Sequence, residues 1–223
     1  HVRSRRQRQM CIRDRSTPRA YERSTRQRIV ARAREWVRAV TPAVSDLLAY
    51  EAVASASALS APESFARLVE EGSLTSLAAT DADLANAKAS AQPRLDAASA
   101  TLTRYYGGVY FSYTQALELD ALLAAIDHQP DSPAEATLVA AVLGTASDLV
   151  ATVGSHFAQP SRLRDRSGVV KPAVAARVLR ARNTSAFELF DKWLQRYASL
   201  EVAEHPCACL LYTSDAADDS LRV

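Results

Sequence analysis

The segment 154–168, which reads GSHFAQPSRLRDRSG, gathers the side chains best suited to polar chemistry in this 223-residue chain. It holds a histidine, a glutamine and three arginines between two glycines, whereas its surroundings are mostly alanine, leucine and valine at helical spacing. Residues 161–196 carry nine lysines and arginines against three acidic residues, a net charge of +6. A basic cluster of this kind attracts a polyanion through release of bound counterions. The alternative is that the same charges form a solvated helix face and a polar linker.

Several common kinds of active site are missing from the sequence. It contains no glycine-rich phosphate-binding or dinucleotide loop, and the stretch 153–156, VGSH, lacks the second glycine of a nucleophile elbow. His156 stands alone, and a lone histidine beside an aromatic residue is more often packed or hydrogen-bonded than catalytic. Cys11, Cys207 and Cys209 lie near the ends, so residues 16–206 offer neither a disulfide nor a cysteine zinc site. We therefore predict no catalytic, cofactor-binding or metal-binding residue in this chain.

The two ends differ in pattern from the rest of the chain. Residues 1–15, with QMCIRDR, and residues 207–223, with CLLYTSDAADD, match translated sequencing-adapter read-through. We expect both ends to be non-native and disordered. The alternative for the basic head is a nucleic-acid-binding arm. The sequence shows no long apolar run and no signal-like apolar block, so the cytoplasm is the expected compartment.

Between the ends, apolar residues recur at spacings of three and four, which predicts helices in series. The first stripe ends at Thr41-Pro42 and consists of Ile29, Val30, Ala33, Trp36, Val37 and Val40. We divide the chain into an alanine-rich helical region, 16–103, and a second helical region, 104–206, which contains the basic loop 154–172. The predicted fold class is all-α, an irregular arrangement of several helices without a sheet.

Local signals place the ends and turns of these helices. Gly107-Gly108 predicts a turn, and Gly144 inside a helix pattern permits a close helix crossing. A helix from Pro172 to Arg182 is expected to point Val174 and Val178 inward and its three arginines outward. Capping boxes are expected at three sites, Ser112 with Gln115, Ser132 with Glu135 and Ser185 with Glu188. An inward-facing Val53 is expected on the second helix.

Three stretches together resemble the Dam-like adenine-specific DNA methyltransferases. They are YYGGVYFSYTQALELDALLAAI, LVAAVLGTASDLVATVGSHFAQP and a basic segment leading into the helix that begins RNTSAF. Enzymes of that family transfer a methyl group from S-adenosylmethionine to the exocyclic amino nitrogen of adenine. The resemblance covers about residues 103–200 and is weak over 20–102.

The resemblance implies a role in DNA recognition without catalysis. The family's cofactor loop, F-x-G-x-G, and its Asp-Pro-Pro-Tyr motif do not occur here, so the chain is expected to hold no S-adenosylmethionine and to be inactive alone. It is expected to be the helical segment between those motifs, with double-stranded DNA and the remainder of the methyltransferase chain as partners. The candidate DNA contacts are His156, Gln159, Arg162, Arg164, Arg166, Lys171, Arg177, Arg180 and Arg182.

Two alternatives stay open. The chain could be a self-contained helical interaction or regulatory protein, which predicts a well-packed core and cooperative unfolding. A fragment that has lost the sheet its helices should cover would instead be loosely packed, with exposed apolar surface. The aromatic segment from Tyr105 to Tyr113 fits core packing better than a base-stacking platform.

Overall fold

The computed structural model describes residues 23–75, 78–126, 133–150 and 160–198. Within these ranges the chain is all-α, as predicted, with no β-sheet. The expectations for residues 1–15 and 207–223 lie outside the described residues. The elements are α2 (Arg23–Val40), the 3-10 turn η2 (Thr41–Val44), α3 (Ser45–Ala56), α4 (Glu63–Glu71), α5 (Ala82–Ala97), α6 (Thr101–Tyr106), α7 (Tyr113–Ala125), α8 (Pro133–Leu149), α9 (Pro172–Arg182) and α10 (Ala186–Ala198).

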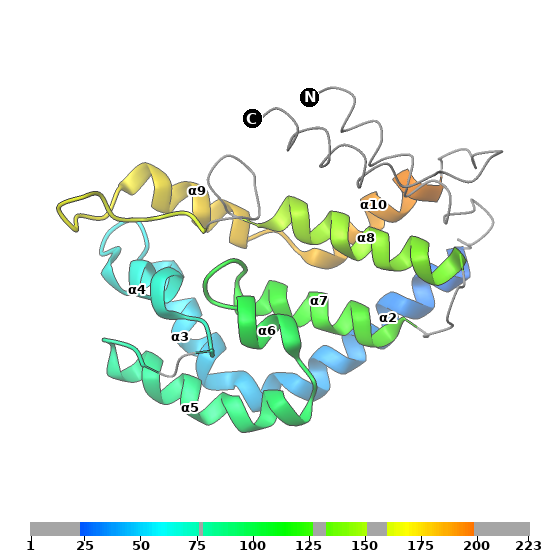
Figure 1. Ribbon diagram of the computed structural model, residues 1–223, viewed down its shortest axis with the longest axis horizontal. Coiled ribbons are helices and arrows are strands. Elements are labelled where there is room, and N and C mark those ends of the chain that lie inside the picture. The colour runs from blue at the N-terminus through cyan, green and yellow to red at the C-terminus, as the bar shows by residue number, and fades with distance from the viewer. Residues whose placement is uncertain (1–22, 76–77, 127–132, 151–159, 199–223) are drawn as a thin grey trace, which may run out of the picture.

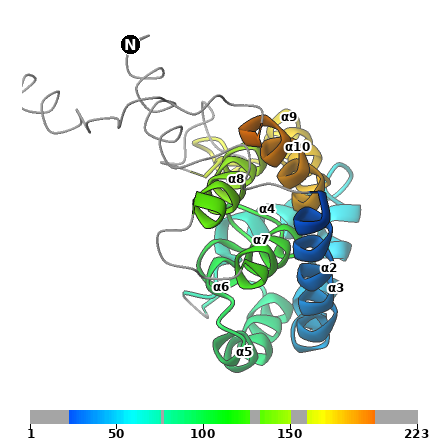
Figure 2. The same cartoon turned by 90° about the vertical axis from the view of Figure 1, so that its right-hand side faces the viewer.

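Helix α7 runs through the middle of the fold and is shared by two apolar cores (Figures 1 and 2). Its Tyr113 and Leu117 pack into the first core, with residues of η2, α3, α4, α5 and α9. Its Leu119 and Leu122 pack into the second core, with residues of α2, α8 and α10. Helix α2 also joins the two cores, with Val40 in the first and Ile29 in the second, so these two helices connect the halves of the molecule.

The cores leave little large apolar surface on the described residues. The exposed large apolar side chains are spread over several elements, with only Tyr105 and Tyr106 on the same helix, and they are Val53, Leu59, Tyr105, Tyr106, Leu143 and Val169. The prediction that Val53 faces inward is wrong, because its side chain is 71% exposed. The wide apolar face expected of helices that have lost a covering sheet is not found in this part of the chain.

Local sequence signals account for several helix ends. Ser112 accepts from the Gln115 N–H at 3.0 Å while the Gln115 carboxamide accepts from the Ser112 N–H at 3.1 Å, so the predicted capping box at α7 is confirmed. Helix α9 begins at Pro172 and ends at Arg182, as predicted. The predicted cap at Ser132 lies outside the described residues.

The start of α10 is capped by a residue that local sequence does not suggest. Glu118, from α7, accepts hydrogen bonds from the Ala186 N–H at 2.6 Å and from the Ser185 hydroxyl at 3.1 Å. Ser185 Oγ in turn accepts from the Phe187 N–H at 3.2 Å. Ser185 thus caps α10 as the sequence suggested, and a second cap comes from a carboxylate on α7 at the Ala186 N–H.

Two glycine positions allow close approaches that hold the fold together. A Cβ at Gly144 would lie 2.5 Å from the Trp193 ring, so the ring of α10 packs directly on the backbone of α8 where glycine has no side chain. Gly108, with φ of +79°, meets Gly72 so closely that a Cβ would lie 2.7 Å from the Gly72 Cα. The turn before α7 is therefore packed directly on the end of α4.

Candidate nucleic-acid interface

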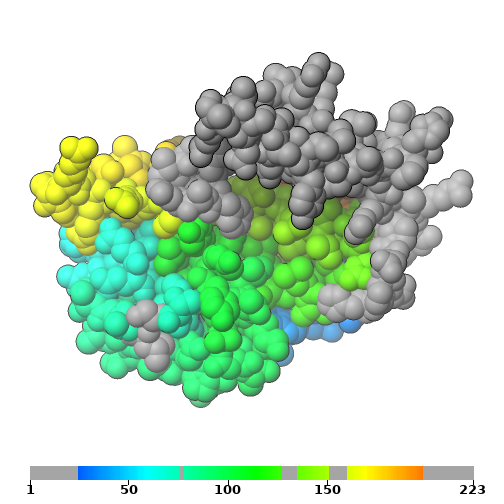
Figure 3. Space-filling view, viewed as in Figure 1, coloured from blue at the N-terminus to red at the C-terminus, as the bar shows by residue number. Residues whose placement is uncertain are grey.

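The basic segment folds into a short hairpin, residues 163–171, that leads into α9. Arg164 and Val170 form an antiparallel bridge, and the Lys171 N–H donates to the Leu163 carbonyl at 2.8 Å. Leu163 and Val170 are buried in the first core, which anchors both strands of the hairpin. The hairpin and α9 project at one end of the described molecule (Figures 1 and 3).

The tip of the hairpin is organised by Asp165. Its carboxylate accepts hydrogen bonds from the Ser167 N–H at 2.8 Å, from the Ser167 hydroxyl at 2.6 Å and from the Val169 N–H at 3.0 Å. These bonds, the Ser167 hydroxyl first, hold the pKa of Asp165 below its usual range. Gly168, with φ of +86°, closes the turn. The hairpin therefore has a set conformation before any partner binds.

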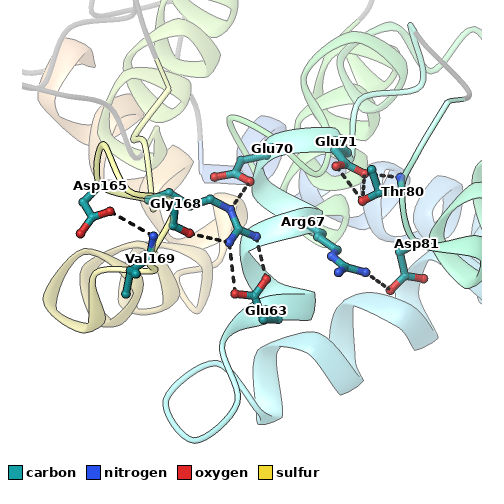
Figure 4. A network of polar contacts seen from close by, with 10 residues as sticks. Glu63, Arg67, Glu70, Glu71, Thr80, Asp81, Asp165, Gly168 and Val169 are labelled. Atoms are coloured by element: carbon teal, nitrogen blue, oxygen red, sulfur yellow. Dashed lines mark hydrogen bonds and ion pairs between the residues drawn. The ribbon is translucent and has the colours of Figure 1, made fainter.

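An arginine clasp ties the hairpin to α4 (Figure 4). Arg164 donates to the Glu63 carboxylate at 2.8 and 3.1 Å and to the Glu70 carboxylate at 2.9 Å. It also donates to the Gly168 carbonyl at 3.0 Å. Hydrogen bonding to Arg164 lowers the pKa of Glu63, and the two glutamates raise the pKa of Arg164. We call Arg164, Glu63 and Glu70 the surface clasp.

Five candidate cations remain on the outside. Arg177 and Arg180 lie on the exposed side of α9, and an Arg177 guanidinium nitrogen lies 3.4 Å from Ser161 Oγ. Within the described residues, no hydrogen bond or ion pair holds the side chains of Arg162, Arg166 and Lys171, and all three are exposed. The exposed charges therefore continue from the hairpin onto α9 and can meet a partner.

Arg182 corrects one expectation, because its side chain points inward and is only 3% exposed. Its guanidinium pairs with the Glu51 carboxylate at 3.4 Å and donates to the carbonyls of Gly108 and Val109. It also stacks over the Phe65 ring, 5.5 Å from the centroid. In this position Arg182 holds α9 to the interior and presents no charge to an external partner.

Glu51 and Arg182 form an ion pair between helices, which we call the buried pair. Further polar groups surround it. Glu51 also accepts from the Tyr113 N–H at 2.9 and 3.1 Å, and the Tyr113 hydroxyl donates to the Gly72 carbonyl at 2.5 Å. Burial raises the pKa of Glu51, although Arg182 opposes the rise, and burial lowers the pKa of Arg182. The ends of α4 and α9 and the start of α7 are thus joined through one network.

The remaining two candidate DNA contacts, His156 and Gln159, lie outside the described residues. In the aromatic segment, Phe111 and Tyr113 are buried, as expected for core packing, whereas Tyr105 and Tyr106 are exposed. The Tyr106 ring packs edge-on against the Tyr110 ring, with 5.7 Å between centroids.

Glu63 and Glu70 were not identified from the sequence, although a signal existed. They are seven residues apart, which places them two turns apart on one face of a helix. Sequence alone does not reveal that a cation 94 residues farther along the chain reaches that face.

Two hollows open on the described surface. One, of about 400 Å³, lies between α2 and the first turns of α10 and is bordered by Arg34 and Phe187. The other, of about 650 Å³, lies among α3, α4 and α5 and is bordered by Asp46, Asp81 and Asp83. The described residues contain no cluster of three or more histidines, cysteines and acidic residues able to hold a metal ion.

None of the described helices combines the length and the apolar character needed to cross a membrane. No protein-family description, no curated protein and no solved structure matches the chain.

Proposed function

We propose that this chain is a target-recognition-type segment of an adenine-specific DNA methyltransferase, which binds double-stranded DNA and does not transfer methyl groups by itself. The observation that carries the proposal is the basic hairpin 163–171, which is anchored at both strands and clasped to α4. The family resemblance over residues 103–200 supplies the identity of the partner.

The hairpin suits a polyanion because its exposed cations are presented on a preformed backbone. Arg162, Arg166 and Lys171 keep free donors, and Arg177 and Arg180 extend the same charge along α9. A preformed hairpin loses little conformational freedom on binding, so more of the contact energy appears as affinity. Contacts to phosphates by such side chains position a protein on a duplex without reading its sequence.

In this proposal the methyl donor and the reacting adenine bind to other parts of the enzyme. The F-x-G-x-G and Asp-Pro-Pro-Tyr motifs that hold them in the family do not occur in these 223 residues. The remainder of the methyltransferase chain is therefore the second proposed partner, and S-adenosylmethionine is proposed as its cofactor.

The test is binding of the full chain to a fluorescein-labelled 20-base-pair duplex, followed by anisotropy at several NaCl concentrations. The triple variant Arg162→Gln/Arg166→Gln/Lys171→Gln should bind more weakly, and its slope of log K against log salt should be smaller by about 3, at roughly 0.9 per lost phosphate contact. Arg94→Gln, on the exposed side of α5, is the control for loss of positive charge. Equal slopes for wild type and triple variant would refute the role of the hairpin.

A second candidate function is a self-contained helical interaction module. It is favoured by the two closed cores, which need no sheet to cover them. Cooperative thermal unfolding with little binding of a hydrophobic dye, together with no affinity for the duplex, would select this alternative.

A further inference from the structure

A second basic surface lies on α2, outside the hairpin and α9. Residues 25–40 contain five arginines and one glutamate. Ile29, Ala33 and Val40 form the buried stripe of this helix. The exposed side therefore carries the charge, with Arg28, Arg32, Arg34 and Arg38 on it.

Core packing and surface contacts fix α2 beside α10 (Figure 2). Arg26 forms an ion pair with Asp191, and the Arg34 guanidinium lies 5.6 Å from the centre of the Phe187 ring. The hollow between the two helices is bordered by Arg34, Phe187 and Ser185, the residue just before α10. The middle of α2 thus faces the start of α10.

The junction between α9 and α10 is itself held rigidly by α7. The Gln115 carboxamide donates to the carbonyls of Ala181 at 2.7 Å and Thr184 at 2.8 Å. Glu118 caps the first turn of α10, as described above. Arg180 is exposed on the last turn of α9, immediately before this junction.

Exposed cations therefore lie near the junction on two elements that are distant in sequence, with Arg180 in the last turn of α9 and Arg34 on α2 bordering the same hollow as Ser185. Arg177 and Arg180 lie on α9, and Arg34 and Arg38 lie on α2, one helical turn apart. Acidic side chains also occur here, with Glu35 on α2 and Glu188 on α10, but the arginines outnumber them on α2. A helix of this length spans about 27 Å, enough to pass several phosphates of a duplex.

We propose that the arginine face of α2, through Arg34 and Arg38, contacts the phosphate backbone of the same duplex that binds the hairpin and α9. This inference rests on the proposed function and extends the footprint across the α9–α10 junction. In this inference α2 contributes to the affinity for DNA and to the orientation of the protein on it, and not to sequence recognition, because phosphate contacts carry no base information.

The experiment measures the same duplex by anisotropy with the full chain, so that residues 1–22 contribute equally to every variant. Arg38→Gln should reduce the slope of log K against log salt by about 1, and Arg34→Gln/Arg38→Gln by about 2. Arg94→Gln removes the same charge from α5, at the opposite edge of the fold from α9, and should leave the slope unchanged (Figure 1). Circular dichroism melting of each variant checks that the fold is retained.

The outcomes separate this inference from the proposed function. If Arg166→Gln/Lys171→Gln lowers the slope and the α2 variants do not, the α2 contact is refuted while DNA binding by the hairpin stands. If neither pair lowers it, both proposals fail. If Arg94→Gln lowers it as much as Arg38→Gln, the effect is one of net charge and the α2 surface is refuted.

Discussion

Arg164 and Arg182 belong to the same basic segment, and each pairs with glutamate from the first third of the chain. In the surface clasp, Arg164 is 26% exposed and Glu63 is 59% exposed. In the buried pair, Arg182 is 3% and Glu51 is 9% exposed. The same two chemical groups therefore meet once at the surface, partly exposed to water, and once in the interior, where charges are screened far less.

Hydrogen-bond geometry alone does not show which of the two pairs contributes more to the stability of the fold. The surface clasp has shorter and more numerous hydrogen bonds, 2.8 to 3.1 Å, than the 3.4 Å contact of the buried pair. Yet an exposed pair contributes little to stability, because water solvates the separated charges almost as well. Removing one member of a buried pair leaves the other charge in the interior without its counter-ion, so the loss is larger.

The largest effect is expected from Arg182→Met, which keeps the apolar stem and removes the charge. Glu51 would then be buried without its counter-ion, and the carbonyls of Gly108 and Val109 would lose a donor. We expect the free energy of unfolding to fall by about 3–5 kcal/mol, measured by urea denaturation at pH 7. Arg180→Met, on the exposed side of the same helix, should change it by less than about 0.5 kcal/mol.

A loss below about 1 kcal/mol for Arg182→Met would contradict the expected difference between the buried pair and the surface clasp. It would mean that water or a proton on Glu51 replaces the guanidinium at small cost.

A smaller effect should follow from removing both charges of the buried pair. In Glu51→Gln/Arg182→Met neither charge of the pair is left in the interior, and the Gln carbonyl can still accept from the Tyr113 N–H. The double variant should recover about 1–3 kcal/mol of the stability lost in Arg182→Met. Urea denaturation of the two single variants and the double variant gives this coupling directly. If the double variant loses as much as the sum of the single variants, Glu51 and Arg182 are not coupled.

The sequence contained enough information to predict the local parts of this architecture. The bounds of α9 and the capping box of α7 depend on residues three or four positions apart, so the local pattern determines them. Close packing at Gly144 could be predicted for the same reason, since a lone glycine in a good helix pattern indicates a close neighbour, although the sequence did not identify that neighbour as Trp193.

Contacts between distant segments could not be predicted in this way. Glu118 caps α10 from 68 residues away, and Asp120 caps α6 by accepting from the N–H groups of Leu102 at 2.9 Å and Thr103 at 2.8 Å. A carboxylate on one helix reaches the start of another only after the helices have packed. The hairpin and its surface clasp depend on tertiary contacts for the same reason.

The buried pair had a signal that was overlooked. Arg182 continues the inward stripe of Ala175 and Val178 at spacings of three and four. Glu51 occupies the same kind of position on α3, between buried Leu47 and Ala54. A charged residue within an apolar stripe indicates a buried ion, and opposite charges in two such stripes suggest a pair. The sequence could therefore have separated Arg182 from Arg177 and Arg180.

The surface clasp should respond weakly to loss of its arginine. Arg164→Gln removes a partly exposed set of ion pairs, and we expect the free energy of unfolding to fall by less than about 1 kcal/mol. Arg162→Gln, two residues away and exposed, is the matched control and should have no measurable effect. A loss above about 2 kcal/mol in urea denaturation would mean that the surface clasp contributes to stability as a buried ion pair does.

The smallest effect is the pH dependence of the clasp, which follows from the lowered pKa of Glu63. A carboxyl group whose pKa is lower in the folded than in the unfolded protein stabilises the fold above its unfolded pKa, here about 4.5, and loses that contribution as the pH falls through the folded pKa. The difference in melting temperature between wild type and Arg164→Gln should therefore be constant from about pH 7 to 5 and shrink below about pH 4.5.

The raised pKa of Glu51 makes an opposite contribution to the pH dependence of stability, because a carboxyl that is easier to protonate in the fold favours folding at low pH. Loss of Arg182 removes the charge that opposes this rise, so the stability lost in Arg182→Met should decrease as Glu51 takes up a proton. Both differences from wild type should therefore shrink on acidification, the Arg164→Gln difference only below about pH 4.5 and the Arg182→Met difference already at higher pH, because the pKa of Glu51 is raised. Melting of the three proteins between pH 7 and 3 compares the two sites in one experiment, and two differences that begin to shrink at the same pH would contradict the assignment of one pair to the surface and the other to the interior.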